Sequence, residues 1–504
     1  MQIEPSEIAF AERYRRGEPQ VVWTTLVADL ETPVSAFLKV GGKPMSFLLE
    51  SVEGGAVRGR YSIIGLDPDL IWRAREGKAE INRSARSNRG AFAPCPETPL
   101  DALRSLIAES RIALPENLPP MAAGIFGYLG YDMVRLMEAL PPANPDPIEI
   151  ADAILVRPTI IVVFDAVKDS ITVVTPVRPE TGLDAGIALS RAVERLANVT
   201  ESLDGPLNKA PSEHGSGPID IPAKSNTTPD EFKAMVRKAK EYIVAGDAFQ
   251  IVLAQRFEAP FNLPAFSLYR ALRRTNPSPY LYFLDFGDFA VAGSSPEILV
   301  KVSNGVVTIR PIAGTRHRGA TAAEDRALAE ELLADPKERA EHLMLLDLGR
   351  NDVGRVASIG TVNVTDQFFI ERYSHVMHIV SNVEGKLAKG RDALDALAAG
   401  FPAGTVSGAP KVRAMQIIDE LEKEKRGIYA GCVGYFSATG EMDTCIILRT
   451  ALIKDGKMYV QAGAGIVADS DPDFEQQECI NKAKALFRAA EEARRFASAA
   501  KRAQ

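Results

Sequence analysis

The stretch FAVAGSSPEILVKVSNGVVTIRPIAGTR, residues 289–316, holds a two-residue turn between two strand-like runs and predicts an antiparallel hairpin. Asn304-Gly305 favours a primed hairpin turn, because both residues accept a positive φ. Counting outward from the turn without a bulge predicts three facing pairs, which are Ser303 with Val306, Glu297 with Ile312, and Ser295 with Gly314. The hairpin would therefore bring Glu297 beside the Gly314-Thr315 peptide.

A second hairpin is predicted in CIILRTALIKDGKMYVQAGAGIV, residues 445–467, with its turn at Asp455-Gly456. The same counting places Arg449 opposite Ala462, next to Gly463 and Gly465. A guanidinium beside backbone N–H groups that glycine leaves accessible is a suitable seat for a carboxylate. A bulge in either hairpin would shift its register by one residue.

Two parts of the chain are predicted, joined by a linker-like segment. Residues 201–226 are rich in Pro, Gly, Ser and Asn and lack apolar periodicity, which is typical of a connection. A helix is expected directly after them, with Thr228 as its cap and Pro229 as its first residue. The chain has 504 residues, which is long for one domain. We therefore predict an N-terminal part over residues 1–200 and a C-terminal part over residues 227–504.

Composition and charge narrow the class of protein. Apolar residues make up 46% and charged residues 25%, as in ordinary globular proteins, and the net charge of −7 argues against nucleic-acid binding. No apolar run of about eighteen residues predicts a membrane span, and the first residues lack the apolar segment of a secretory signal. The four cysteines form no C-x-x-C pair and are expected to be reduced thiols. The sequence thus predicts a cytoplasmic protein that binds neither nucleic acid nor membrane.

Two glutamate pairs, each with a spacing of three, are candidates for a metal site. Glu338 and Glu341 follow the helix start Asp335-Pro336, and the similar start Asp471-Pro472 precedes Glu475 and Glu478. This spacing puts both carboxylates of a pair on one face of a helix. Two helices that offer oxygen ligands suit Mg²⁺. On spacing alone, a solvated helix face is the more common outcome for such a pair.

One histidine and one cysteine are candidates for acid–base or nucleophilic chemistry. His378 lies among strand-like residues in ERYSHVMHIVSNVEG. A group that titrates near neutral pH suits a general acid or base, and a hydrogen-bonded core histidine is the alternative. Cys432 in GCVG superficially resembles a glutaminase nucleophile, but no histidine follows it in the chain. We therefore interpret Cys432 as a buried strand residue.

Several motifs in one order identify a family. PIAGTRHRG, EHLMLLDLGRND, GTVSGAPKVRAM, DTCIILRTA, QAGAGIV and an E-x-x-E followed by NKAKA occur along the C-terminal part. From about Thr227 to its end, the chain resembles the chorismate-utilising enzymes, which include the anthranilate, aminodeoxychorismate, isochorismate and salicylate synthases. The resemblance implies an α+β fold, a large two-sheet α/β sandwich with helices outside the antiparallel sheets.

Two positions indicate a branch of this family. Relatives that add water look to have a lysine base in a K-V-V-L-A-R string, whereas this chain reads FQIVLAQRF with Gln250 at that place. A neutral amide cannot deprotonate water, but ammonia arrives already nucleophilic. Aminodeoxychorismate synthases commonly show a lysine where this chain has Ala313. The chain thus resembles the large subunits of anthranilate synthases, which implies amination of chorismate and loss of pyruvate in the first step of tryptophan biosynthesis.

The resemblance also implies a role for each matching residue. The catalytic residues would be His378 in the elimination, Glu297 as an acid of raised pKa that protonates the leaving hydroxyl, and Gln250. Mg²⁺ would be held chiefly by Glu341 and Glu478, with Glu338 and Glu475 close by or acting through water. Chorismate would contact Gly314, Thr315, Tyr429, Arg449, Gly463, Ala464, Gly465 and Lys482, and Lys411 is a further candidate for carboxylate pairing.

A feedback site is implied by matches in both parts of the chain. FLLESVEGG, GRYSIIG and TNPSPYLYF resemble the segments that bind inhibitory tryptophan. The inhibitor-binding residues would be Glu50, Ser51, Asn276, Pro279, Tyr280 and Leu281. Leu281 stands where methionine is usual, and its similar apolar volume predicts that inhibition survives.

The resemblance extends to a partner and leaves two alternatives open. No glutaminase domain is recognised in the chain, so use of glutamine would need a separate amidotransferase subunit that supplies ammonia. The first alternative is an aminodeoxychorismate synthase component of folate biosynthesis, against which Ala313 argues. The second is a non-catalytic sensor that only binds tryptophan, against which the intact Glu297, His378 and Arg449 argue.

Overall fold

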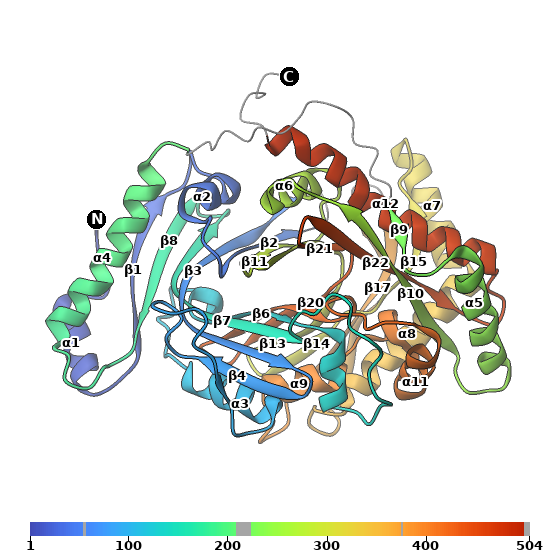
Figure 1. Cartoon of the computed structure of the whole chain (residues 1–504), viewed down its shortest axis with the longest axis horizontal. Helices are drawn as coiled ribbons and strands as arrows, with labels where there is room; N and C mark the ends of the chain where they lie inside the picture. The colour runs from blue at the N-terminus through green and yellow to red at the C-terminus, as the bar shows by residue number, and fades with distance from the viewer. Residues whose placement is uncertain (54–56, 208–222, 374–375, 498–504) are drawn as a thin grey trace.

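The sheets of this protein form from runs of β-branched and aromatic residues, which pack well on a pleated surface. Examples are β2 (Ser46–Glu53) and β7 (Ala153–Asp165). The computed structural model describes residues 1–53, 57–207, 223–373 and 376–497. Within these ranges, two antiparallel sheets pack face to face and carry helices on their outer faces (Figure 1). The predicted α+β sandwich is therefore confirmed.

The first sheet contains strands from both ends of the sequence. Its order is β1 (Gln20–Val27), β8 (Ser170–Val177), β7, β3 (Val57–Arg75), β2, β11 (Tyr280–Asp285), β12 (Phe289–Ser295), β21 (Thr450–Lys454), β22 (Lys457–Ile466) and β10 (Gln250–Pro260), with antiparallel pairing throughout. The short strands β9 (Lys224–Ser225) and β18 (Gly408–Ala409) also pair with β10. The β2–β11 pairing, which sets Glu50 opposite Leu281, joins the N-terminal part to the C-terminal part.

The second sheet is built around the C-terminal part. Its order is β6 (Gly124–Leu129), β19 (Cys432–Ser437), β20 (Met442–Ile446), β13 (Ile298–Ser303), β14 (Val306–Ile309) and β17 (Val376–Lys386), and β15 (Ile312–His317) and β16 (Asn363–Arg372) both pair with β17. The start of β7 pairs with β6, and the end of β3 pairs with β4 (Lys78–Asn82), which carries β5 (Ala93–Pro94). The two long strands β3 and β7 thus take part in both sheets.

The three largest apolar clusters of the described residues form the main core. Between the sheets lies a cluster that includes Phe47, Phe126, Tyr282, Val433 and Leu452. A second cluster lies under helices on the first sheet, which are α2 (Pro33–Val40), α4 (Ala185–Asp204), α6 (Ala265–Thr275) and α12 (Pro472–Ala497). A third lies under helices on the second sheet, which are α3 (Pro99–Glu109), α8 (Pro336–Gly354), α9 (Ala393–Gly400) and α11 (Lys411–Leu421).

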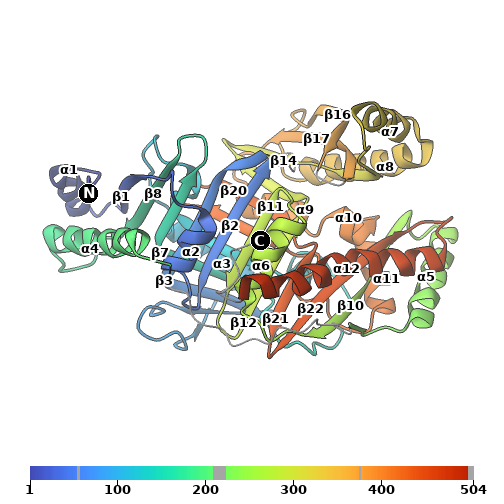
Figure 2. The same ribbon diagram turned by 90° about the horizontal axis from the view of Figure 1, so that it is seen from above.

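The remaining helices pack against these helices and strands. They are α1 (Glu7–Arg15), α5 (Pro229–Val244), α7 (Ala322–Ala334) and α10 (Gly404–Ser407), with two 3₁₀ turns at Pro120–Ala122 and Tyr131–Leu136. Figure 2 shows α12 lying across β22 and β10, with α7 and α8 set beside β16 and β17. Of the helices in the described ranges, none has both the length and the apolar character needed to cross a membrane.

The predicted linker overlaps regular structure at both of its ends. Helix α4 continues to Asp204, and β9 occupies Lys224–Ser225, while residues 208–222 lie outside the described residues. The helix predicted after it begins as expected. Thr228 accepts a hydrogen bond from the Glu231 N–H, and the Glu231 carboxylate accepts one from the Thr228 N–H. This reciprocal cap satisfies backbone donors that the first turn leaves free.

The first hairpin follows the predicted register only near its turn. Asn304 and Gly305 have φ values of 51° and 72°, and Ser303 faces Val306. The more distant pairs, Glu297 with Ile312 and Ser295 with Gly314, were predicted wrongly. Pro311 has no N–H to donate, and beyond it the chain leaves β13 and pairs with β17 as β15. Thr315 therefore faces His378.

The second hairpin keeps the predicted register as far as Ala451, which faces Val460. The turn residues Asp455 and Gly456 have φ values of 50° and 71°. The pair of Arg449 with Ala462 was predicted wrongly, because β21 begins only at Thr450. Arg449 has a left-handed backbone with φ 47°, which bends the chain before the strand. The bend releases its side chain from the sheet register.

Candidate active site

Glu297 lies in the connection between β12 and β13 and is buried, with 7% of its surface exposed. Burial raises the pKa of Glu297 to about 8, because a carboxylate loses its hydration there. The Thr405 hydroxyl donates a hydrogen bond of 3.2 Å to Glu297 Oε1, and the charge of Arg449 also opposes the rise in pKa. At neutral pH, Glu297 therefore carries a proton that it can donate. This is the direction of pKa shift that the acid role implied for Glu297 requires.

His378 on β17 is buried and held by the neighbouring strand β15. Its Nδ1 lies 2.9 Å from the Gly314 carbonyl oxygen and 3.1 Å from Thr315 Oγ1, and its ring meets the Tyr373 ring edge-on at 5.5 Å. Because a carbonyl oxygen only accepts, Nδ1 carries the proton and Nε2 keeps a lone pair. Burial lowers the pKa of His378 to about 4. The imidazole is therefore neutral at pH 7 and can accept a proton at Nε2.

The Arg449 guanidinium lies close enough to Glu297, Tyr373 and His378 to act on them electrostatically. Among the described residues, it has no hydrogen-bond or ion-pair partner. Burial lowers the pKa of Arg449, yet a guanidinium keeps its charge at neutral pH. A partly buried cation without a carboxylate partner is costly unless a ligand supplies one. The arrangement suits an anionic ligand between the acid and the base.

Glycines on β22 make room for two side chains. Gly463, Ala464 and Gly465 pair with β10, facing Ala254, Leu253 and Val252. A Cβ on Gly465 would lie 2.7 Å from Gln250 Nε2, and a Cβ on Gly463 would lie 2.8 Å from the hydroxyl of Tyr429, which is buried. Any larger residue would displace these side chains. The glycines therefore let Gln250 and Tyr429 lie against the strand.

Gln250 connects this strand to an acidic region. Its amide donates a 3.3 Å hydrogen bond to Glu341 Oε1. Its own Oε1 is buried and has no partner among the described residues. A buried carbonyl oxygen without a donor costs about 1–3 kcal/mol. The position therefore favours a ligand that brings N–H or O–H groups.

The two glutamate pairs lie at the starts of α8 and α12. Asp335 caps α8 by accepting from the Lys337 and Glu338 N–H groups, and Asp471 accepts in the same way at α12 from Asp473 and Phe474. These caps confirm both predicted helix starts. The pKa of Glu341 is raised by burial and then by the charges of Glu338 and Glu478. The pKa of Glu475 is likewise raised by burial and by the charge of Glu478. The four carboxylates therefore share one electrostatic region although they belong to separate helices.

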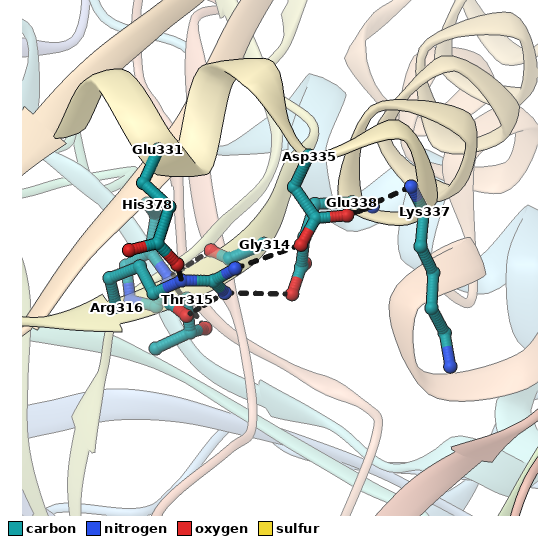
Figure 3. A network of polar contacts seen from close by, with 8 residues as sticks. All are labelled: Gly314, Thr315, Arg316, Glu331, Asp335, Lys337, Glu338 and His378. Carbon is teal, nitrogen blue, oxygen red and sulfur yellow. Dashed lines mark hydrogen bonds and ion pairs between the residues drawn. The ribbon is translucent and has the colours of Figure 1, made fainter. Parts of the chain in front are cut away.

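Arg316 ties Glu338 to β15 (Figure 3). Its guanidinium donates to Glu331, Asp335 and Glu338 at 3.1, 2.9 and 3.1 Å. Glu338 Oε2 lies on the other side, 3.1 Å from the place where a Cβ of Gly314 would be. Gly314 has φ 71° and forms the bulge whose carbonyl holds His378. The acidic region and His378 are thus positioned by the same three residues of β15.

Lys482 and Lys411 have different surroundings. Lys482 on α12 forms a 2.6 Å ion pair with Glu478 and donates to the Gly463 carbonyl at 2.9 Å. Lys411 is buried and pairs with Asp352 at 3.0 Å. Lys411 therefore stabilises the start of α11, and its ammonium is already matched by a carboxylate. Of the two, only Lys482 lies between the acidic region and the glycine strand.

The acidic region fits a hard divalent cation in its chemistry. Its donors are all carboxylate oxygens, and their mutual repulsion would be relieved by a cation. Within the described residues, however, no three His, Cys, Asp or Glu side chains are gathered as a metal-binding group. Glu338 and Glu478 are instead paired with Arg316 and Lys482. The donor set is present, and two of its four carboxylates are held by internal cations.

A cavity of about 380 Å³ lies at the other end of the first sheet. Its lining includes Glu50, Ser51 and Leu281, together with Arg273 and Pro277. The Glu50 carboxylate accepts two hydrogen bonds from Arg273, at 2.7 and 2.9 Å, and one from the Tyr269 hydroxyl. Three residues predicted for the inhibitor site thus line a cavity with a buried, fully paired carboxylate.

The other three predicted inhibitor residues do not line this cavity. Tyr280 faces the opposite side of β11 from Leu281, and its hydroxyl donates to Asp443 at 3.1 Å. The Asn276 carbonyl accepts from the Ser294 hydroxyl, and the Ser294 N–H donates to the Arg449 carbonyl at 3.2 Å. Pro279 precedes β11. Hydrogen bonds through Ser294 therefore connect Asn276, which precedes the cavity-lining Pro277, to Arg449.

Sequence reasoning missed several supporting residues. Thr405 on Glu297, Arg273 on Glu50 and Arg316 on Glu338 each hold a candidate functional carboxylate. Thr405 lies in the quoted GTVSGAPK string, which was a usable signal. Cys432 is fully buried in β19, as interpreted, and burial raises the pKa of its thiol to about 12. His375, the other histidine of the quoted ERYSHVMHIVSNVEG string, lies outside the described residues.

Comparison with known proteins gives matches along nearly the whole chain. The family described as chorismate binding enzyme matches residues 58–488. Anthranilate synthase component 1 of Cereibacter sphaeroides is 58% identical over 492 residues, which cover 97% of this chain and 98% of that protein. The protein of the same name from Pseudomonas putida is 48% identical and covers 92% and 93%.

Solved structures give the same result. The crystal structure of anthranilate synthase component I from Streptococcus pneumoniae superposes with a TM-score of 0.75 at 40% identity, covering 92% of this chain and 98% of that one. MenF, the menaquinone-specific isochorismate synthase of Escherichia coli, superposes with a TM-score of 0.70 at 20% identity, covering 96% and 100%. At that identity, the likeness to MenF concerns the fold alone.

Proposed function

The chain belongs to the chorismate-binding enzyme family, and from this membership we propose that it catalyses the anthranilate synthase reaction on chorismate. One observation carries the proposal. A protonated Glu297 and a neutral His378 both lie within electrostatic reach of the Arg449 guanidinium, which has no hydrogen-bond or ion-pair partner among the described residues, in a chain that is 58% identical over nearly its whole length to an anthranilate synthase component 1. The reaction converts chorismate and ammonia into anthranilate, pyruvate and water.

Arg449 holds a carboxylate of chorismate in this proposal. The substrate carries two carboxylates, on the ring and on the enolpyruvyl ether, and a guanidinium binds a carboxylate through two parallel hydrogen bonds. The backbone of Gly463, Ala464 and Gly465 lies against the ring, because no side chain larger than methyl intervenes. Tyr429 and the Gly314-Thr315 peptide close the remaining sides. The substrate then lies between Glu297 and His378.

Glu297 acts in the first step as the general acid. Ammonia forms a bond to ring carbon C2, both ring double bonds shift by one position, and the bond from C4 to its hydroxyl breaks. Glu297 gives its proton to the departing hydroxyl, which leaves as water. The amine then loses one proton to solvent. Gln250 has no basic group, so the site does not activate water, while its buried amide oxygen can accept an N–H of ammonia.

His378 acts in the second step as the base. Its Nε2 takes the proton from C2 of the amino intermediate, the bond from C3 to the ether oxygen breaks, and the ring becomes aromatic. The enolpyruvyl group leaves as an enolate and gains a proton to become pyruvate. The Gly314 carbonyl fixes the tautomer that keeps Nε2 free. Acid and base are therefore different residues with pKa values shifted in opposite directions.

Mg²⁺ is the cofactor in this proposal. Glu341 and Glu478 would hold it, with Glu338 and Glu475 close by, and when bound it would supply positive charge that polarises the ring carboxylate. The support is the all-oxygen donor set and the like-charge effect on the pKa of Glu341 and Glu475. Two further parts of the proposal are a separate amidotransferase subunit that supplies ammonia in the cytoplasm and feedback inhibition by tryptophan. The cavity supports the inhibitor part, because Glu50, Ser51 and Leu281, which match the family's tryptophan-binding segments, line it together.

The test is an assay of the purified chain with chorismate, Mg²⁺ and ammonium, in which anthranilate is followed by its fluorescence. We expect turnover that is lost on chelation and restored by Mg²⁺, and that falls when tryptophan is added. Full turnover after thorough chelation would contradict the metal, and absence of anthranilate would contradict the reaction. Replacing His378 with alanine should accumulate the amino intermediate. Equal loss of amination and elimination would contradict its separate role.

A further inference from the structure

The Lys482 ammonium lies between two acceptors of different kinds. One is Glu478 Oε1 at 2.6 Å, one helical turn earlier on α12, and the other is the Gly463 carbonyl oxygen at 2.9 Å on β22. Helix α12 lies across β22 in Figure 2, which brings the two acceptors together. A single cation thus touches both the acidic region and the glycine strand.

The two acceptors belong to functionally distinct surroundings. Glu478 is part of the region that also holds Glu341 and Glu475, where like charges repel one another. Gly463 begins the strand segment that runs beside Gln250 and Tyr429, where an anionic ligand would lie. Lys482 therefore lies between the acidic region, which would bind a cation, and the glycine strand, where an anionic ligand would bind.

The charge of Lys482 partly neutralises the acidic region. It opposes the rise in the pKa of both Glu341 and Glu475. A divalent cation bound by Glu478 would repel an ammonium at 2.6 Å from the same carboxylate. The two cations therefore compete for Glu478, and the metal-bound region must release Lys482.

Release of Lys482 is inexpensive. About half of its side chain, 46%, is exposed, so its ion pair with Glu478 is screened by solvent. Its flexible four-carbon stem carries three donors, and the bond to the Gly463 carbonyl can persist while the contact with Glu478 breaks. The ammonium then stays beside the glycine strand with a donor free for a carboxylate.

We propose that Lys482 is an exchangeable counter-ion, which holds Glu478 in the metal-free protein and turns to a carboxylate of the substrate once a divalent cation takes Glu478. This inference rests on the proposed function. It predicts positive coupling, because the metal releases the lysine that the substrate needs, and the substrate removes the lysine that competes with the metal. Metal and chorismate should therefore each strengthen binding of the other.

The test is titration calorimetry on Lys482→Met, which keeps the length and helix preference of the side chain. Mg²⁺ alone is titrated first. We expect Mg²⁺ to bind roughly two- to fivefold more tightly to the variant, because a screened competing ion pair is removed. Chorismate is then titrated at saturating Mg²⁺, with Glu297→Gln added to prevent turnover. We expect it to bind at least about tenfold more weakly, because a charge-assisted hydrogen bond is lost.

Two control variants make these opposite shifts specific. Lys484→Met removes an exposed lysine from the same helix and should change neither affinity. Lys482→Arg keeps the positive charge and should restore the weaker Mg²⁺ binding. If the Lys482→Met protein binds Mg²⁺ with unchanged or lower affinity while the native protein binds Mg²⁺ and makes anthranilate, the counter-ion inference fails by itself. If the native protein takes up no Mg²⁺, the metal proposal and this inference fail together.

Discussion

Glu50 and Glu297 are both buried carboxyl groups, but their surroundings differ. Glu50, on β2, receives two hydrogen bonds from Arg273 and one from the Tyr269 hydroxyl. Glu297, between β12 and β13, receives one hydrogen bond from a neutral hydroxyl of Thr405. Its neighbouring cation Arg449 acts at longer range and forms no ion pair with it. One carboxyl is therefore matched by its surroundings and the other is left to hold a proton.

The difference distinguishes a binding charge from a reacting group. A buried carboxylate with a bidentate arginine keeps its charge and its position. A buried carboxyl without such a partner has a raised pKa and can donate a proton at neutral pH, which general acid catalysis needs. Four substitutions test this contrast, and they are ordered by the size of the expected effect.

Glu297→Gln should have the largest effect. The amide keeps the shape of the side chain but cannot donate a proton to the leaving hydroxyl, so kcat should fall by roughly 10²–10⁴-fold. The variant should stay folded and gain thermal stability, most clearly above pH 8, because the native protein must then ionise this buried acid. Anthranilate fluorescence and thermal unfolding measure the two quantities. A kcat within tenfold of the native value would remove Glu297 from the role of acid.

Arg273→Met should unfold the protein more readily, since Glu50 would be left buried without its cation. Breaking a buried ion pair from one side costs roughly 3–5 kcal/mol. Denaturant unfolding should show this loss, and Glu50→Gln in the same chain should recover most of it. Arg274→Met is the matched control, because this neighbouring side chain is exposed. If the Arg273→Met protein has the same free energy of unfolding as the native protein, the Arg273–Glu50 ion pair does not contribute to stability.

Thr405→Val should shift the pH dependence of the reaction. Glu297 has a raised pKa of about 8, so activity should be present below that pH and fall as the pH rises through it. The Thr405 hydrogen bond lowers the pKa of Glu297, and its removal should move the alkaline limb of kcat/KM upward by about one unit. Ser407→Ala removes a hydroxyl from the same short helix and should leave the limb in place. A downward shift of the alkaline limb would contradict the inference that the Thr405 hydrogen bond lowers the pKa of Glu297.

Ser294→Ala should have the smallest effect, and it tests whether the two regions communicate. Ser294 contacts the Asn276 carbonyl through its hydroxyl and the Arg449 carbonyl through its N–H. Loss of the hydroxyl should weaken tryptophan inhibition by about fivefold, a coupling change of about 1 kcal/mol, while tryptophan binding itself persists. Inhibition curves and tryptophan calorimetry separate the two. Ser46→Ala, another buried serine that donates to a carbonyl, is the control. Equal inhibition in both variants would argue against coupling through Ser294.

Local signals in the sequence predicted local structure well. The cap at Thr228 and the turn at Asn304-Gly305 depend on residues within three positions of each other, and both have the predicted geometry. The hairpin registers failed where distant strands intervene. Pro311 directs β15 to β17, and the left-handed Arg449 ends the ladder of β21. Which strand β15 pairs with, and where β21 ends, depend on strands distant in the sequence, and counting residues outward from a turn does not take these into account.

The site shows the same limit. Resemblance found residues that share a motif, and Arg449 does lie close enough to both Glu297 and His378 to act on their pKa. Thr405 and Arg273 were missed, because each is a common residue type whose partner lies 108 or 223 positions away. A threonine in a glycine-rich string and an arginine at a helix end have ordinary local explanations. Only the folded chain shows which carboxyl each one contacts.

The pairing of β6 with β19 has a consequence for synthesis of the protein. β6 ends at Leu129 and its partner begins at Cys432, so roughly 15 to 60 s of translation separate them at about 5–20 residues per second. β2 is likewise synthesised long before its partner β11. During that interval the nascent chain presents unpaired strand edges and apolar faces, which invite aggregation. Chaperone depletion during expression should therefore reduce the soluble yield of this chain.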